Sequence, residues 1–384
     1  MSAIDKNRRR LLQAGALGAA GAAAVPVAGW ASALQSRRSA SVAAAVAEGA
    51  PIRLDLNESA FGPSPRVETA IREACGQIPR YVGADQTLAL QRQIAALEGV
   101  EPEQVILGEV LEALGQRLAM IAGDAEFVYS VPGYTALVDA AGPFMSQAIE
   151  VPLNDRLEND LPALLAAISD RTTAVFVVNP HNPSGTVSER GAFDAFVRTA
   201  ARETLVIVDE AYLDYLDDAA ARSAVRWLRA GHDVMVFRTL GKIHALAGLQ
   251  IGYALAPLDL ALGLQKHGVI GAAHAQNQLS IAAASASLAD PAHIADVRAR
   301  TLVERSKYVR LLEQLKLRYA EPAGNFVFFD SGHPHAEVAG ALLAKGIKVA
   351  REFPRYQTWI RITVGTPEQS EIALRVVREV LESR

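Results

Sequence analysis

The sequence predicts an α/β protein with a large domain, built on a mostly parallel sheet with helices on both faces, and a smaller α/β domain. Three apolar runs rich in β-branched residues, at 175–178, 205–208 and 234–237, are typical of strands buried on both faces. Helical stretches at 161–168 and 192–201 precede the first two runs. This alternation indicates parallel strands joined by crossover helices that cover both sides of the sheet.

Each of these predicted strands is followed by a polar side chain that can do chemistry. Asn182 follows the first strand and Asp209 follows the second, while Thr239 and Lys242 follow the third. In open α/β sheets, ligands bind outside the carboxyl ends of the strands. We therefore expect an amide, a carboxylate and an amine to meet at one edge of the sheet.

Lys242 has mostly apolar and glycine neighbours in the segment 239–253. Burial would favour its neutral amine, which is a nucleophile that can form a Schiff base. The alternative is a lysine whose stem packs against the protein while its ammonium reaches water. The three groups together suit pyridoxal phosphate, because a carboxylate keeps the pyridine nitrogen protonated and an amide can bond the ring oxygen. The pattern therefore predicts a pyridoxal phosphate site around Lys242.

Four short motifs carry a resemblance to a known family. They are Asn-Pro-Ser-Gly at 182–185, Asp-Glu-Ala-Tyr at 209–212, Thr-Leu-Gly-Lys at 239–242 and Leu-Ala-Gly-Leu at 246–249. In this order and spacing they resemble the fold-type I pyridoxal-phosphate-dependent aminotransferases, most closely the histidinol-phosphate aminotransferase branch. The resemblance runs from near Leu54 to the C-terminus. It implies an enzyme that moves an amino group between an amino acid, or a related amine, and a 2-oxo acid.

The resemblance also implies how the cofactor is held. Lys242 would bind it covalently and, once released, act as the general base that moves a proton from the substrate. Asp209 would pair with the pyridine nitrogen, and Asn182 and Tyr212 would bond the ring oxygen. Thr239 would contribute to the site of the phosphate.

Four further residues receive roles from the resemblance. Tyr134 would stack on the pyridine ring, and Tyr81 would reach the phosphate of a neighbouring subunit, which makes the enzyme a homodimer. For both tyrosines, ordinary packing is the competing interpretation. Arg361 would receive the carboxylate or phosphate of the substrate in a forked pair, with Asn325 assisting, and a surface arginine is the alternative.

The chain departs from the family where the phosphate should bind. Serine usually precedes the lysine and arginine follows eight residues later, but this chain has Gly241 and Gln250. The loop after the predicted strand 105–107 is shortened to Gly108 and Glu109, which puts negative charge near the phosphate. Either the cofactor is held less tightly, or hydroxyls and backbone amides carry more of its phosphate. These departures leave a degenerate binding protein open as an alternative. A lyase or decarboxylase of the same fold is the other alternative, because the same residues support any chemistry that makes a stabilised carbanion.

The expected domains are not contiguous in the chain. The large cofactor domain should span 85–290, and the smaller domain should combine 51–84 with 291–384. Within the latter, strands are expected at 326–329, 347–350 and 359–364 and helices at 292–315, 336–345 and 367–381. Residues 1–47 are expected to be a signal peptide and linker.

The N-terminal segment resembles a twin-arginine export signal. Three consecutive arginines, 8–10, precede Leu11 and Leu12, and an Ala/Gly-rich run follows. Small-residue cleavage sites end at Ala33 and Ala47, and both remain possible. We expect a periplasmic protein exported by the twin-arginine machinery, or a membrane-anchored one if the segment is retained. Histidinol phosphate is then a doubtful substrate, because histidine synthesis is cytoplasmic.

Charge and metal-binding residue types exclude other classes of protein. The formal net charge is −4, and the N-terminal segment that resembles an export signal is itself positive, so the rest of the chain is more acidic than this total. We therefore expect no nucleic-acid surface, which would need a basic footprint. The eight histidines are scattered and Cys75 is the single cysteine, so we expect no metal site and no intramolecular disulfide. His333 and His335 flank a proline in an expected loop and should be solvated.

Overall fold

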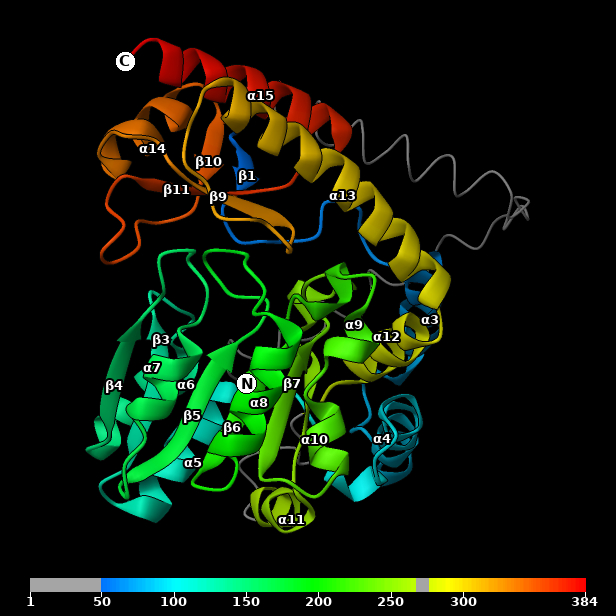
Figure 1. Ribbon diagram of the computed structural model, residues 1–384. Coiled ribbons are helices and arrows are strands. Elements are labelled where there is room, and N and C mark those ends of the chain that lie inside the picture. The colour runs from blue at the N-terminus through cyan, green and yellow to red at the C-terminus, as the bar shows by residue number, and fades with distance from the viewer. Residues whose placement is uncertain (1–49, 267–275) are drawn as a thin grey trace, which may run out of the picture. The chain divides into compact units, whose positions relative to one another are not determined.

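The computed structural model describes residues 50–266 and 276–384, so the predicted export signal lies outside the described part of the chain. Residues 48–384 form one compact unit. Its main sheet has seven strands in the order β2-β8-β7-β6-β5-β3-β4 (Figure 1). They are β2 (Val105–Leu107), β3 (Glu126–Val131), β4 (Gln147–Pro152), β5 (Thr172–Val178), β6 (Leu205–Asp209), β7 (Val234–Thr239) and β8 (Gly252–Leu255).

The strands β3 to β7 are mutually parallel, whereas β8 runs antiparallel to both β7 and β2. The predicted mostly parallel sheet is therefore confirmed. The strands β5, β6 and β7 are direct neighbours in the sheet. Their carboxyl ends, after which the three chemical groups follow, consequently lie side by side.

Helices cover both faces of this sheet, as predicted. In β7, Val234 and Val236 belong to the hydrophobic cluster on one face, while Met235 and Phe237 belong to the cluster on the other. Burial of both faces explains why the strand is a continuous apolar run. One face packs on α3 (Pro65–Ala74), α4 (Ala84–Glu98), α7 (Leu161–Ala166), α8 (Arg190–Ala200), α10 (Val225–Arg229) and α12 (Gln278–Leu288), and the other on α5 (Leu111–Ala122), α6 (Ala136–Ala141) and α11 (Leu258–Lys266).

Two small sheets and three helices surround a separate hydrophobic cluster. The strand β1 (Ile52–Leu54) pairs in parallel with β10 (Ile347–Val349), and β9 (Phe326–Asp330) pairs antiparallel with β11 (Trp359–Thr363). The first described segment of the chain thus packs with the last. The helices are α13 (Pro291–Gln314), α14 (His335–Ala344) and α15 (Pro367–Glu382). The exact domain boundaries stay a prediction.

The predicted elements of the C-terminal region lie within a few residues of the observed ones, but β4 and β8 were not predicted. β4 lies at the edge of the main sheet and has mostly exposed residues. β8 begins at Gly252, where an added Cβ would lie 2.6 Å from the carbonyl oxygen of Arg238. A glycine at the start of a strand weakens the strand pattern, although here it allows β7 and β8 to approach.

The prediction for His335 was wrong. Its side chain is buried, and Nε2 donates a hydrogen bond to the carbonyl oxygen of Ala350 at 2.9 Å. His335 is therefore the buried first residue of α14, not a solvated residue of a loop.

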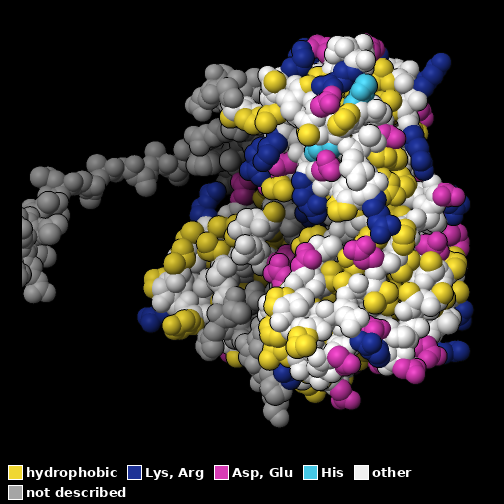
Figure 2. Space-filling view, turned by 90° about the vertical axis from the view of Figure 1, so that its left-hand side faces the viewer, with side chains coloured by type: hydrophobic (Ala, Val, Ile, Leu, Met, Phe, Trp, Pro, Cys, Tyr) yellow, Lys and Arg dark blue, Asp and Glu magenta, His cyan; other side chains and the backbone are white. Residues whose placement is uncertain are grey.

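On the face shown in Figure 2, acidic and basic side chains are interspersed, and apolar side chains lie among them. None of the helices within residues 50–266 and 276–384 is both long enough and apolar enough to cross a membrane.

Candidate active site

The carboxyl ends of β5, β6 and β7 open into a cavity of about 1020 Å³. The cavity also receives side chains from the C-terminal region and from the segment that follows β1. Seven of the nine predicted site residues line it, namely Tyr134, Asn182, Asp209, Tyr212, Thr239, Lys242 and Arg361. Most of the predicted site residues therefore lie around one cavity.

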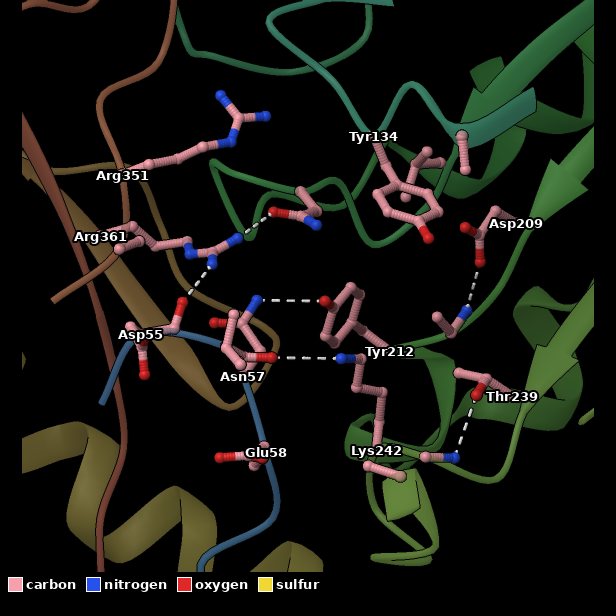
Figure 3. Close-up of a pocket in the computed structure, with 18 of the residues that line it drawn as sticks. Asp55, Asn57, Glu58, Tyr134, Asp209, Tyr212, Thr239, Lys242, Arg351 and Arg361 are labelled. Atoms are coloured by element: carbon pink, nitrogen blue, oxygen red, sulfur yellow. Dashed lines mark hydrogen bonds between the residues drawn. The ribbon is translucent and has the colours of Figure 1, made fainter. Parts of the chain in front are cut away.

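Lys242 is half-buried and follows β7 at a tight turn. Its carbonyl oxygen accepts a hydrogen bond from the backbone N–H of Ala245, which has a φ of 60°. The ammonium nitrogen Nζ donates to the carbonyl oxygen of Leu56 at 3.3 Å and lies 5.9 Å from the centre of the Tyr212 ring (Figure 3). The amine therefore faces the cavity, held by one weak contact that a ligand can replace.

Asp209 is buried at the end of β6. Burial, with a smaller contribution from the negative charge of Glu109, raises the pKa of this carboxyl from 3.8 to about 6. A hydrogen bond from the backbone N–H of Ala211 at 2.9 Å and the charge of Lys242 act in the opposite direction. A buried carboxylate short of positive partners fits a protonated pyridine nitrogen, which would stabilise its charged form.

Two tyrosines flank the space between Asp209 and Lys242 (Figure 3). Tyr212 is buried, its hydroxyl accepts a hydrogen bond from Asn57 Nδ2 at 3.0 Å, and its ring packs edge-to-face on Phe326. Tyr134 is partly exposed to the cavity, and burial, followed by the charge of Asp209, raises the pKa of its hydroxyl to about 12. An accessible ring beside a buried carboxylate is suited to cover a flat heteroaromatic ligand.

Arg361 lies on β11 and is buried at the opposite side of the cavity (Figure 3). Its Nη1 donates to Asn182 Oδ1 at 2.6 Å and its Nη2 donates to the carbonyl oxygen of Asp55 at 2.8 Å. Its Nε has no hydrogen-bond partner among the described residues. Because the Asn182 oxygen is taken by Arg361, the Asn182 amide nitrogen is left to donate to a ligand.

The structure adds a residue that the sequence analysis did not single out. Asn57 has a φ of 55°, a left-handed conformation that asparagine adopts more readily than most residues. Its backbone N–H donates to Thr363 Oγ1 at 3.0 Å, and its side chain donates to Tyr212. Asn57 thus connects the N-terminal segment to both halves of the cavity. No sequence signal for this role was available, because each contact depends on residues far along the chain.

The two remaining predicted residues lie outside the set that lines the cavity. Asn325 is buried and its Nδ2 donates to the carbonyl oxygens of Asn57 and Glu58, so it supports the N-terminal segment. The side chain of Tyr81 is 85% exposed, and its carbonyl oxygen accepts a hydrogen bond from Gln278. The roles of both residues stay predictions.

At one end of the cavity, which we call the phosphate end, lie Gly108, Glu109, Thr239, Gly241 and Gln250. Thr239 Oγ1 accepts a hydrogen bond from the backbone N–H of Gly241 at 3.0 Å and donates to Glu109 Oε1 at 2.7 Å. The neighbouring guanidinium of Arg238 is engaged by carboxylates, with Glu210 at 2.9 Å. A hydroxyl and a backbone amide here suit a phosphate, whereas the carboxylate of Glu109 does not.

The residues present therefore fit the ring of pyridoxal phosphate well and its phosphate only in part. Across the described ranges no group of three or more His, Cys, Asp or Glu residues could hold a metal ion. A lysine, a buried carboxylate and an amide at neighbouring strand ends, faced by an arginine from the C-terminal region, define a pyridoxal-phosphate-dependent enzyme.

Comparison with known proteins gives the family. The family model described as aminotransferase class I and II matches residues 50–377, and the chain belongs to this family. It is 34% identical over 336 residues to a histidinol-phosphate aminotransferase of Moorella thermoacetica, covering 86% of this chain and 85% of that protein. It is also 34% identical over 336 residues to a histidinol-phosphate aminotransferase of Anaeromyxobacter sp., covering 86% of this chain and 90% of that protein.

A solved structure supports the cofactor. The crystal structure of histidinol-phosphate aminotransferase from Sinorhizobium meliloti in complex with pyridoxal 5'-phosphate has a TM-score of 0.77 and 27% identity, and the match covers 87% of this chain and 91% of that one. The protein is a pyridoxal-phosphate-dependent aminotransferase, as the motifs predicted.

Proposed function

We propose that the protein takes an amino group from an amino acid, or a related amine with an anionic group, and passes it to a 2-oxo acid in the periplasm. The observation that carries the substrate class is Arg361, a buried guanidinium with an unpartnered Nε in the same cavity as Lys242. Burial lowers the pKa of Arg361. An anionic group of the substrate would compensate the buried positive charge and accept a hydrogen bond from the Arg361 guanidinium.

When bound, pyridoxal phosphate supplies an aldehyde that takes up the amino group and a ring that withdraws electrons from the reacting carbon. Lys242 Nζ would hold the cofactor and, once displaced, carry the proton between substrate and cofactor carbons. Asp209 would keep the pyridine nitrogen protonated. Asn182, oriented by Arg361, and Tyr212 would donate to the ring oxygen. Tyr134 would cover the ring and keep water away from one face.

Arg361 alone does not decide whether the anion is a carboxylate or a phosphate. The relatives named histidinol-phosphate aminotransferases favour a phosphate, because the substrate in their name carries one. We favour the carboxylate of an amino acid, because histidine synthesis is a cytoplasmic pathway and we propose that this protein is exported. Arg351 also lines the cavity and adds positive charge that would favour acidic donors, whereas Lys348 is paired with Asp55 at 2.8 Å.

A half-reaction assay tests the activity. Cofactor-loaded protein is mixed with single amino donors, and conversion to the aminated cofactor is followed by absorbance. We expect conversion with acidic amino donors and reversal on addition of a 2-oxo acid. Release of carbon dioxide without a transferred amino group would instead support the decarboxylase alternative. Absence of any spectral change with every donor would support the degenerate binding protein.

Export rests on the arginines at 8–10, which lie outside the described residues. Changing Arg8 and Arg9 together to lysine removes the arginine pair, whereas Arg10→Lys leaves it intact and serves as the control. We expect only the double variant to accumulate in the cytoplasm, as measured by cell fractionation. N-terminal sequencing of the periplasmic protein then distinguishes cleavage after Ala33 from cleavage after Ala47. Equal fractionation of all variants would contradict the proposal.

The homodimer is proposed with shared active sites. The exposed position of Tyr81, outside the cavity of its own chain, supports this arrangement. Co-expression of Lys242→Ala with Tyr81→Ala tests it, because a mixed dimer would contain one site with both residues intact. We expect activity above that of either variant alone. No gain, in a preparation shown by mass spectrometry to contain mixed dimers, would exclude shared sites.

A further inference from the structure

The Thr239 hydroxyl at the phosphate end of the cavity is already engaged. It donates to Glu109 Oε1 at 2.7 Å, and Glu109 directly follows Gly108, whose φ is 121°. The short turn after β2 therefore directs a carboxylate to Thr239, whose hydroxyl is the one that the five residues at this end of the cavity offer to a phosphate. A phosphate oxygen and the Glu109 carboxylate need the same donor.

Within the described part of the chain, the residues that define the phosphate end offer no positive charge to balance Glu109. Among the five residues that define the phosphate end, none is cationic. Arg238 is the neighbouring cation, but Glu210, Asp214 and Glu98 lie at 2.9, 3.4 and 3.8 Å from its guanidinium nitrogens. The negative charge of Glu109 also acts on other residues of the cavity, because it contributes to the raised pKa values of Asp209 and Tyr134.

We propose that Glu109 is a built-in competitor of the cofactor phosphate, so that the phosphate adds little to cofactor affinity. The protein would then bind pyridoxal phosphate and pyridoxal, which lacks the phosphate, with similar affinity. This inference rests on the assignment of the cavity to pyridoxal phosphate and goes beyond it, because it concerns which part of the cofactor the protein recognises.

Two effects combine to weaken phosphate binding. The Glu109 carboxylate must release the Thr239 hydroxyl before a phosphate oxygen can accept from it, so one charge-assisted hydrogen bond is exchanged for another with no net gain. The two negative groups would then remain close to each other, which opposes binding. Because Glu109 is exposed, solvent screens this repulsion in part, and the exchange of the hydrogen bond is the larger effect.

Equilibrium titration tests the proposal. Cofactor-free protein is titrated separately with pyridoxal phosphate and with pyridoxal, and the visible absorbance of lysine-bound ligand is followed. For Glu109→Gln we expect the affinity for pyridoxal phosphate to rise by about tenfold or more, with little change for pyridoxal. Glu112→Gln, which removes the same charge three residues later in α5, should give a much smaller gain.

A double-mutant cycle checks that Glu109 acts through Thr239. In a Thr239→Val background, which lacks the hydroxyl, the gain from Glu109→Gln should shrink to a small electrostatic remainder. An undiminished gain there would overturn the competition, as would equal gains for both ligands or no gain in Glu109→Gln.

The cofactor assignment can fail separately. If neither ligand produced lysine-bound absorbance in the natural protein or in any variant, pyridoxal phosphate itself would be the wrong cofactor, and the proposal for Glu109 would fall with it.

Discussion

Asp209 is the buried carboxyl expected to face the pyridine nitrogen of the cofactor. Its pKa of about 6 means that the carboxylate which holds a protonated pyridine is lost as the pH falls through that value. We expect the affinity for pyridoxal phosphate to weaken below about pH 6 and to level off above it. Titrations at several pH values measure this, and Asp209→Asn should be weak throughout. Parallel pH profiles in the two proteins would contradict the role.

The raised pKa of Asp209 should also make the folding stability of the cofactor-free protein depend on pH. The pKa of this carboxyl rises from 3.8 in the unfolded chain to about 6 in the folded one, so the folded state binds the proton more tightly. Its stabilising contribution is complete below pH 3.8 and is lost as the pH rises through about 6. Asp209→Asn should therefore raise the free energy of unfolding at neutral pH, by up to about 3 kcal/mol.

Denaturant unfolding at neutral pH measures this change. Asp217→Asn is a suitable control, because that side chain is 90% exposed and the substitution should alter stability little. If only Asp209→Asn raises the free energy of unfolding and the same variant loses cofactor affinity, Asp209 destabilises the fold but is needed for cofactor binding. An Asp209→Asn protein that is less stable than the natural one would contradict the sign.

Arg361 should affect substrate affinity more than turnover. Arg361→Lys keeps the charge but loses the forked donor and the contact that orients Asn182. We expect KM for the amino donor to rise about tenfold or more, with a smaller fall in kcat. Arg355→Lys, which changes an exposed arginine paired with Glu150 at 3.4 Å, is the control. Steady-state kinetics that show equal KM values for both variants would remove Arg361 from the substrate site.

At the scale of elements, the central strands and the residues that follow them were the features that the sequence predicted best. Continuous apolar runs such as Val234 to Phe237 are local signals, and the residue that follows each run could be placed at a sheet edge without knowing the fold. Asn57 could not be predicted, because its position depends on Thr363, which is 306 residues away. Glu109 was visible as a wrong charge, but its hydrogen bond to Thr239 depends on the pairing of β2, β8 and β7.

The contact of α5 with α6 allows a test of helix packing next to the cofactor site. Gly115 in α5 lies so close to α6 that an added Cβ would be 2.0 Å from the carbonyl oxygen of Leu137. Gly115→Ala should therefore force the helices apart and cost about 1–3 kcal/mol of folding stability.

Gly263→Ala in α11 is the matched control, because nothing lies within 4 Å of an added Cβ there. That substitution should stabilise the protein by up to about 1 kcal/mol through helix propensity. Thermal unfolding of both variants decides the matter, and equal melting temperatures would contradict the close packing of α5 on α6.

At the scale of the whole molecule, the cavity needs segments from distant parts of the chain, all within the compact unit that begins at Glu48. A chain that starts at Glu48 should therefore fold and bind pyridoxal phosphate as the full-length chain does. Melting temperature and cofactor affinity of the two chains should agree within error. A clear loss of either in the shorter chain would show that residues 1–47 contribute to the fold.

The central claim is that Lys242 binds the cofactor covalently. Borohydride reduction of the protein with pyridoxal phosphate, followed by peptide mass spectrometry, fixes such a bond and locates it. We predict one modified residue, Lys242, and no adduct in Lys242→Ala protein treated in the same way. An adduct on another lysine, or none on Lys242, would contradict the account.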